Sequence, residues 1–218
     1  MESIPLIQTL KRGAFYLISH SVGSCNIENT IVVSGSPRSG TTWLAEMLRE
    51  LPDYKLINEP LRLSTNPQAQ TAGFEWRTHL PPDTNAPEKE THLHEVLRGH
   101  VELGPAWHFR VDTLLGKLRE HVCCDCAIVK FCRVGRMLHW MAERYDVRGT
   151  VVIIRHPCAV IASRLQMGEN WSGSVEKKKE VPVSRRFGGE IPNSICDEFA
   201  HVFEETKLWV EHLAIDWA

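Results

Sequence analysis

Two observations predict an α/β fold in which helices cover both faces of a central parallel sheet, giving a three-layer α/β/α domain. Four short runs rich in β-branched and apolar residues, at 30–34, 54–57, 126–131 and 150–154, are typical of strands. Stretches with helical spacing separate these runs, and strands that alternate with helices are typical of parallel sheets. We expect the strands at 30–34 and 150–154 to be the central ones.

Apolar residues recur at helical spacing in the segments between and around these strands. We expect helices near 4–20, 41–50, 91–100, 108–121, 134–145, 157–166 and 199–213. Five prolines fall between positions 60 and 87, and segment 62–90 has no clean period, so we expect an irregular excursion there. Residues 168–193 are rich in Gly, Pro and Lys, which predicts a mobile segment. The length of 218 residues fits a single domain spanning 1–218.

Composition limits the classes of partner. The hydrophobic content of 43% and the charged content of 24% are those of an ordinary soluble globular protein. A formal net charge of −2 gives no global attraction for nucleic acid or for an anionic membrane, so we expect neither as a partner. The oligomeric state is left open.

The seven cysteines are odd in number and form no matching CxxC pairs. We interpret Cys123, Cys124 and Cys126 as buried or idle thiols rather than as a metal site, and we expect no metal. Free thiols favour a reducing compartment. The first residues also lack the basic region of a secretory signal, so we expect a cytoplasmic protein.

A loop that contains two glycines joins the first predicted strand to the next predicted helix. Its sequence, Gly35-Ser-Pro-Arg-Ser-Gly-Thr-Thr42, nearly fits the phosphate-binding pattern GxxxxGK[ST], with Thr41 in place of the lysine. Unpaired N–H groups and the dipole at a helix start favour an anion there. Gly35 and Gly40 allow a tight turn, and Arg38 adds a cation with a planar donor fork. The loop therefore predicts a P-loop-like, nucleotide-binding site rather than a plain turn.

A second basic element follows the strand at 150–154. Arg155 stands where a nucleotide triphosphatase usually has an aspartate that holds Mg²⁺. Because the loop also has no lysine, the chain lacks two main parts of a kinase or GTPase site. Ser163 follows Arg155 by eight residues, about two turns into the next helix. A guanidinium and a hydroxyl together suit phosphate geometry, although taken alone this pair also fits a surface arginine and a solvated serine.

These two motifs resemble those of the sulfotransferases that use 3′-phosphoadenosine 5′-phosphosulfate (PAPS). The run Pro37-Arg-Ser-Gly-Thr-Thr-Trp-Leu44 is similar to their 5′-phosphosulfate loop, and Arg155–Arg164 to their 3′-phosphate element. The resemblance covers about residues 29–166. It implies PAPS as cofactor, without a metal, and a contact between Arg38 and the transferring sulfuryl group. The implied cofactor-binding residues are Pro37, Arg38, Ser39, Gly40, Thr41, Thr42, Trp43, Arg155 and Ser163.

Two residues are candidates for the base that removes the acceptor's proton. Glu59 follows the second strand, at the edge where open α/β sheets bind ligands, and Asn58–Leu61 resembles a segment of carbohydrate sulfotransferases. His79 lies in Arg77–Pro81, which resembles the segment that carries the base in cytosolic sulfotransferases. Lys130 could also face the site.

The acceptor is then a small molecule or a carbohydrate with a hydroxyl or amine. Two alternatives stay open: a P-loop nucleotide kinase-like enzyme, and a protein that binds PAPS or 3′,5′-ADP without turnover. The second is favoured by the weak match of Arg185–Gly189 to the family's basic Gly-rich segment.

Overall fold

A computed structural model describes residues 24–64, 66–75, 78–100 and 122–166. They form a central, fully parallel sheet of four strands in the order β2-β3-β1-β4, which confirms the predicted fold class. The strands are β1 (Ile31–Gly35), β2 (Tyr54–Asn58), β3 (Cys126–Phe131) and β4 (Gly149–Ile153). Each begins and ends within one residue of the run that predicted it.

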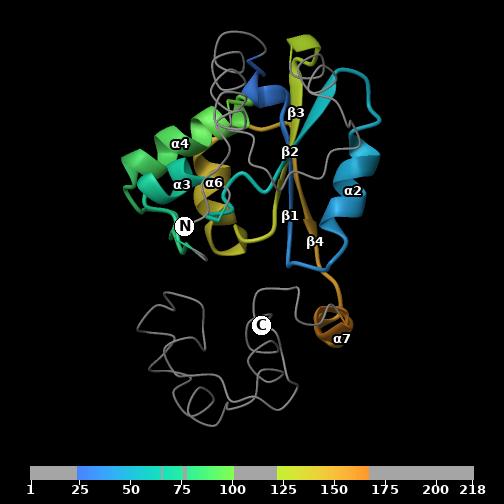
Figure 1. Ribbon diagram of the computed structural model, residues 1–218. Coiled ribbons are helices and arrows are strands. Elements are labelled where there is room, and N and C mark those ends of the chain that lie inside the picture. The colour runs from blue at the N-terminus through green and yellow to red at the C-terminus, as the bar shows by residue number, and fades with distance from the viewer. Residues whose placement is uncertain (1–23, 65, 76–77, 101–121, 167–218) are drawn as a thin grey trace, which may run out of the picture.

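Helices lie on both sides of the sheet, with α2 on one face and α3, α4 and α6 on the other (Figure 1). The helical elements are η1 (Ile27–Asn29), α2 (Thr41–Leu48), α3 (Pro67–Thr71), α4 (Pro87–Leu97), η2 (Gly135–Met137), α6 (Leu138–Arg144) and α7 (Pro157–Gln166). This arrangement makes three layers, as the alternation of strands and helices predicted. The predicted helices near 4–20, 108–121 and 199–213, and the segment 168–193, lie outside the described residues.

The predicted excursion at 62–90 holds more regular structure than expected. Asn66 caps α3, since its side-chain oxygen accepts hydrogen bonds from the N–H groups of Gln68 and Ala69. Helix α4 begins at Pro87, four residues before the predicted start. Proline is well tolerated at a first helical position because its missing N–H would be unpaired there.

Alternate side chains of the strands pack against the two helical layers. Val33, Leu56 and Ile128 are buried with Ala45 of α2 on one face. On the other face a larger core holds residues of the strands, α4 and α6, including Val32, Ile57, Val129, Phe131, Leu93 and Trp140. The alternation follows from the two-residue period of a strand, and it fixes which polar side chains reach the ends of the sheet.

The prediction that 150–154 is a central strand was wrong for the four described strands. β1 is central, as predicted, but β3 is the other central strand and β4 lies at one edge. Val151 and Val152 point to opposite faces of β4 and are 41% and 48% exposed. An apolar run predicts only that its side chains favour burial. The position of a strand within the sheet depends instead on which neighbouring strand each connecting segment crosses. The chain from β3 to β4 passes β1, so β4 takes the outer position.

Two features are absent from the described part of the chain. No helix there has the length and apolar content needed to cross a membrane. No group of three or more His, Cys, Asp or Glu side chains there is placed to hold a metal ion.

Candidate functional site

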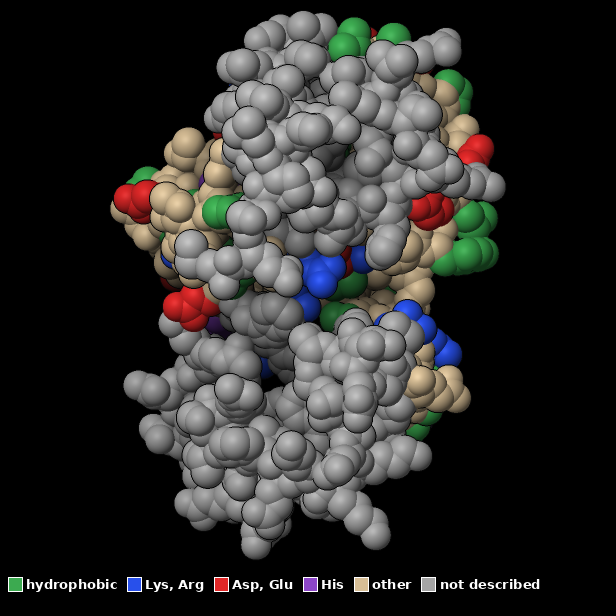
Figure 2. Space-filling model, in the orientation of Figure 1, with side chains coloured by type: hydrophobic (Ala, Val, Ile, Leu, Met, Phe, Trp, Pro, Cys, Tyr) green, Lys and Arg blue, Asp and Glu red, His purple; other side chains and the backbone are tan. Residues whose placement is uncertain are grey.

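The chain segments that carry the predicted site meet at one edge of the sheet. The strands are parallel, so all four carboxyl ends lie at the same edge, where ligands of open α/β sheets bind. The loop 36–40 follows β1, Glu59 follows β2, Cys132 and Arg133 follow β3, and Arg155 follows β4. Lys and Arg side chains gather at the level where β1 and β4 end (Figure 2, in the orientation of Figure 1).

The loop after β1 turns tightly and comes close to β4. Gly40 has φ 108° and precedes α2 as its N-cap, without a side-chain hydrogen bond to the helix. A Cβ on Gly35 would lie 2.7 Å from the carbonyl oxygen of Ile153 and 2.8 Å from Ser39 Oγ, so only glycine fits. The predicted need for glycine at both positions is confirmed by this geometry.

The start of α2 presents polar groups to the loop. Ser39 is buried, and its Oγ has no hydrogen-bond partner within the described residues. Thr41 is also buried, and its Oγ1 lies 3.5 Å from Cys132 Sγ. A buried hydroxyl without a partner beside an uncapped helix start can donate to an oxyanion. Thr42 and Trp43 are exposed, and Pro37 is half-buried.

Arg38, Arg155 and Ser163 come together although they lie far apart in the sequence. Arg38 Nε donates to Ser163 Oγ at 3.0 Å, and Arg155 Nη1 donates to the Arg38 carbonyl oxygen at 3.0 Å. Arg38 has φ 75°, in the left-handed region, and this backbone turn directs its carbonyl to Arg155. The guanidinium of Arg155, after β4, and the hydroxyl of Ser163, on α7, therefore both meet Arg38 of the loop that follows β1.

Glu59, which follows β2 at the same carboxyl edge, forms a close ion pair with Lys130 of β3. Its carboxylate Oε1 lies 2.6 Å from Lys130 Nζ, and its backbone N–H donates to the Lys130 carbonyl at 2.8 Å. The side chains are 17% and 5% exposed, respectively. Burial is the largest single influence and acts to lower the pKa of Lys130, but the charges of Glu59 and Cys132 and the hydrogen bonds to them together outweigh burial, so the pKa is raised. Glu59 itself has φ 53°.

The sequence did not predict Cys132 and Arg133 near this pair, or Arg164 next to those two. Burial, with the nearby charge of Glu59, raises the pKa of the Cys132 thiol to about 11. Burial also lowers the pKa of Arg133 and of Arg164, and the charge of Arg133 adds to the effect on Arg164. Cys132 and Arg133 directly follow a predicted strand, which was a usable signal. Arg164 adjoins Ser163, but its burial depends on packing that the sequence did not show.

His79, the alternative base, lies in a segment beside η2. The next residue, Leu80, donates its N–H to the Arg136 carbonyl at 3.3 Å, which places this segment beside η2. Within the described part of the chain, His79 makes no hydrogen bond or ion pair with Arg38 or Glu59. Glu59 directly follows β2 at the carboxyl edge, whereas the segment of His79 reaches η2, which follows β3.

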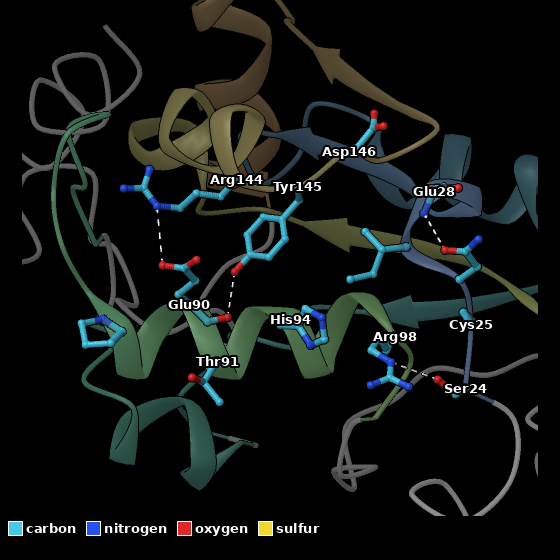
Figure 3. Close-up of a pocket in the computed structure, with 13 residues that line it drawn as sticks. Ser24, Cys25, Glu28, Glu90, Thr91, His94, Arg98, Arg144, Tyr145 and Asp146 are labelled. Carbon is cyan, nitrogen blue, oxygen red and sulfur yellow. Dashed lines mark hydrogen bonds and ion pairs between the residues drawn. The ribbon is translucent and has the colours of Figure 1, made fainter.

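A hollow of about 880 Å³ lies at the opposite edge of the sheet (Figure 3). Residues 24–28, which lead into β1, and residues 144–146, which precede β4, help to line it. Its polar groups contact one another: Tyr145 donates to the Glu90 carbonyl at 2.7 Å, and Arg98 Nε donates to Ser24 Oγ at 3.1 Å. The hollow is thus separate from the carboxyl edge, where the unpartnered hydroxyl and the converging cations lie.

Comparisons with protein-family models, with curated proteins and with solved structures find no match to this chain.

Proposed function

We propose that this protein is a sulfotransferase that binds PAPS and moves its sulfuryl group to a hydroxyl or amine acceptor. The convergence of Arg38, Arg155 and Ser163 beside the loop supports the proposal most strongly. The two motifs that resemble sulfotransferases are more than a hundred residues apart in the sequence. Their contact at one edge of the sheet is what a single ligand with two anionic groups requires.

The polar groups at this edge fit both ends of such a ligand. The loop backbone, with Ser39, Thr41 and Thr42, would hold the 5′-phosphate, because unpaired donors at a helix start favour anions. Arg155 and Ser163 would hold the 3′-phosphate, which distinguishes PAPS from ATP. When bound, PAPS supplies an activated sulfuryl group, and no metal is required for its transfer.

Two residues would assist the transfer itself. Arg38 belongs to the loop that would hold the 5′-phosphate, and its guanidinium would stabilise negative charge on the oxygen that leaves the sulfuryl group. Glu59 would accept the proton of the acceptor hydroxyl as the new oxygen–sulfur bond forms. Its short contact with Lys130 holds the carboxylate in one orientation. In the described sheet, β2 and β1 flank β3, so Glu59 and the loop are separated by a single strand.

Calorimetry with 3′,5′-ADP and ATP tests the proposal directly. We expect 3′,5′-ADP to bind at about −8 kcal/mol, in the low-micromolar range, and ATP to bind far more weakly. Arg155→Met should weaken 3′,5′-ADP by about tenfold or more, since it removes a charge-assisted contact. Arg148→Met is a matched control, because Arg148 contacts Tyr54 and Thr30 at the amino-terminal edge of the sheet.

Two results would redirect the assignment. Mg²⁺-dependent binding of ATP with indifference to 3′,5′-ADP would contradict the proposal and favour a nucleotide kinase. Tight binding of 3′,5′-ADP without turnover of ³⁵S-labelled PAPS on sugars, lipids, phenols or peptides would favour a non-catalytic binding protein.

A further inference from the structure

The thiol of Cys132 lies between the two working parts of the proposed site. Cys132 directly follows β3, and its Sγ lies 3.5 Å from Oγ1 of Thr41, the first residue of α2. Its side chain also forms hydrogen bonds with the side chains of Glu59 and Lys130. Cys132 therefore contacts both the proposed base and the hydroxyl that would help to hold the 5′-phosphate.

Strand packing and register explain why these groups meet. Ile128 of β3 is buried on the sheet face that α2 covers, and alternate side chains of a strand share a face (Figure 1). Lys130 and then Cys132 therefore follow Ile128 on this face, which agrees with the contact between Cys132 and α2. Glu59 arrives from β2, because Asn58 pairs with Lys130 and the N–H of Glu59 donates to the Lys130 carbonyl at 2.8 Å. The neighbouring strands thus bring the carboxylate to the thiol.

The surroundings keep Cys132 protonated and make it a hydrogen-bond donor. Burial and then the charge of Glu59 raise the pKa of the thiol to about 11, so the sulfur carries its proton at neutral pH. A thiol has one proton to donate, and a carboxylate can only accept. The S–H of Cys132 therefore donates to Glu59, and in the 3.5 Å contact the hydroxyl of Thr41 donates to the sulfur.

We propose that Cys132 is a positioning residue for the transfer, which holds the carboxylate of Glu59 in register with the phosphate-binding loop at the start of α2. This role rests on the proposed function, in which Glu59 is the base. Lys130 contacts Oε1 of the carboxylate at 2.6 Å, and a single contact leaves the group free to turn about it. The S–H donor is a second anchor, so the carboxylate keeps the orientation that proton transfer needs.

Infrared spectroscopy of the S–H stretch tests the contact without any ligand. The band of Cys132 is isolated by subtracting the spectrum of Cys132→Ala, both from the wild type and in a Glu59→Ala background. A hydrogen bond lowers the frequency of an S–H band, so we expect the band at lower frequency in the wild type than in Glu59→Ala, which lacks the acceptor. Cys126→Ala is the matched control, because Cys126 lies at the other end of β3 and its loss should leave the Cys132 band unchanged.

Sulfuryl transfer tests the positioning role. The concentration of ³⁵S-labelled PAPS is varied against a fixed pool of methyl glycosides and phenols, which gives turnover at saturating PAPS and the KM for PAPS. Cys132→Ala should lower turnover about tenfold, as loss of a hydrogen bond to a charged group does, and should change the KM by less than about twofold. Cys132→Ser keeps an O–H donor and should restore turnover to within about threefold of the wild type. A merely structural role would produce neither the split between turnover and KM nor the rescue by serine.

The outcomes separate the role of Cys132 from the proposed function. An S–H band that is the same with and without Glu59, or wild-type turnover in Cys132→Ala, would overturn the role. It would also be overturned if Cys132→Ala raised the KM for PAPS and left turnover unchanged, because Cys132 would then serve the cofactor alone. If the wild type bound no PAPS and transferred nothing while the S–H band still shifted with Glu59, the proposed function and the role in transfer would fall. The hydrogen bond between Cys132 and Glu59 would then stand by itself.

Discussion

Replacing Lys130 with methionine should lower the free energy of unfolding by about 3 kcal/mol, because it leaves a largely buried carboxylate without its nearest cation. Lys130 Nζ lies 2.6 Å from Glu59 Oε1, and the two side chains are 5% and 17% exposed. Methionine has nearly the length of the lysine stem and keeps the strand, where Lys130 pairs with Val33 and Asn58. The change therefore removes the charge with little loss of packing.

The size of the effect follows from what remains around Glu59. Removing one partner of a fully buried ion pair costs about 3–5 kcal/mol. The carboxylate retains some contact with water and the positive charge of Arg133, so the lower end of that range applies. Replacing both members, Lys130→Met with Glu59→Gln, leaves no uncompensated charge. The double variant should be more stable than the sum of the single effects predicts, by about 1–3 kcal/mol.

Urea unfolding of the wild type, both single variants and the double variant measures this coupling as a thermodynamic cycle. The midpoints and slopes give each free energy, and unchanged slopes show that the same structure unfolds. If the two single effects added to within about 0.5 kcal/mol, Glu59 and Lys130 would be independent. The view that Lys130 holds the carboxylate in place would then be wrong.

Three further predictions concern the site. Glu59→Gln should lower turnover by about 10²–10⁴-fold with cofactor affinity nearly unchanged, whereas His79→Asn should change turnover little. If His79→Asn abolished turnover and Glu59→Gln did not, the assignment of the base would be reversed. Arg38→Ala should reduce turnover by about 10²-fold or more in single-turnover assays, with a smaller loss of PAPS affinity, and equal losses would point to a binding role alone. Because its pKa is about 11, Cys132 should be alkylated by iodoacetamide at pH 8 about 100-fold more slowly than the exposed Cys158, as mass spectrometry can follow.

Local signals allowed much of the fold to be predicted from the sequence. The strand limits were predicted to within one residue, since β-branched runs are short and end at turn residues. Helix α7 begins at Pro157 and ends at Gln166, as predicted, because proline marks a first helical position. The edge position of β4 was not predictable in the same way. It depends on how each crossover passes the neighbouring strand, which involves contacts between distant segments.

The same distinction applies to the candidate site. Glu59 and Arg155 were predicted from their positions after strands, because parallel strands end at one edge. The ion pair of Glu59 with Lys130 required a further fact, that β2 and β3 are neighbours in the sheet. The position of Arg133 near Glu59 depends on the same neighbour relation, so it emerged only from the structure.

Backbone conformation adds an argument that the sequence could not provide. Among the residues that the structure describes, three that are not glycine have positive φ: Arg38, Asp53 and Glu59. A side chain in the left-handed region costs about 1–2 kcal/mol, so its retention calls for a reason. Asp53 has an ordinary one, because it lies in the turn before β2 and aspartate tolerates this conformation. Arginine and glutamate have no such preference. At Arg38 and Glu59 the unfavourable turn coincides with contacts to Ser163, Arg155 and Lys130 across the carboxyl edge. Backbone strain alone does not mark a functional site. Here, however, it directs two charged side chains to one edge of the sheet, so a role in function explains the retention of Arg38 and Glu59 better than a role in stability does.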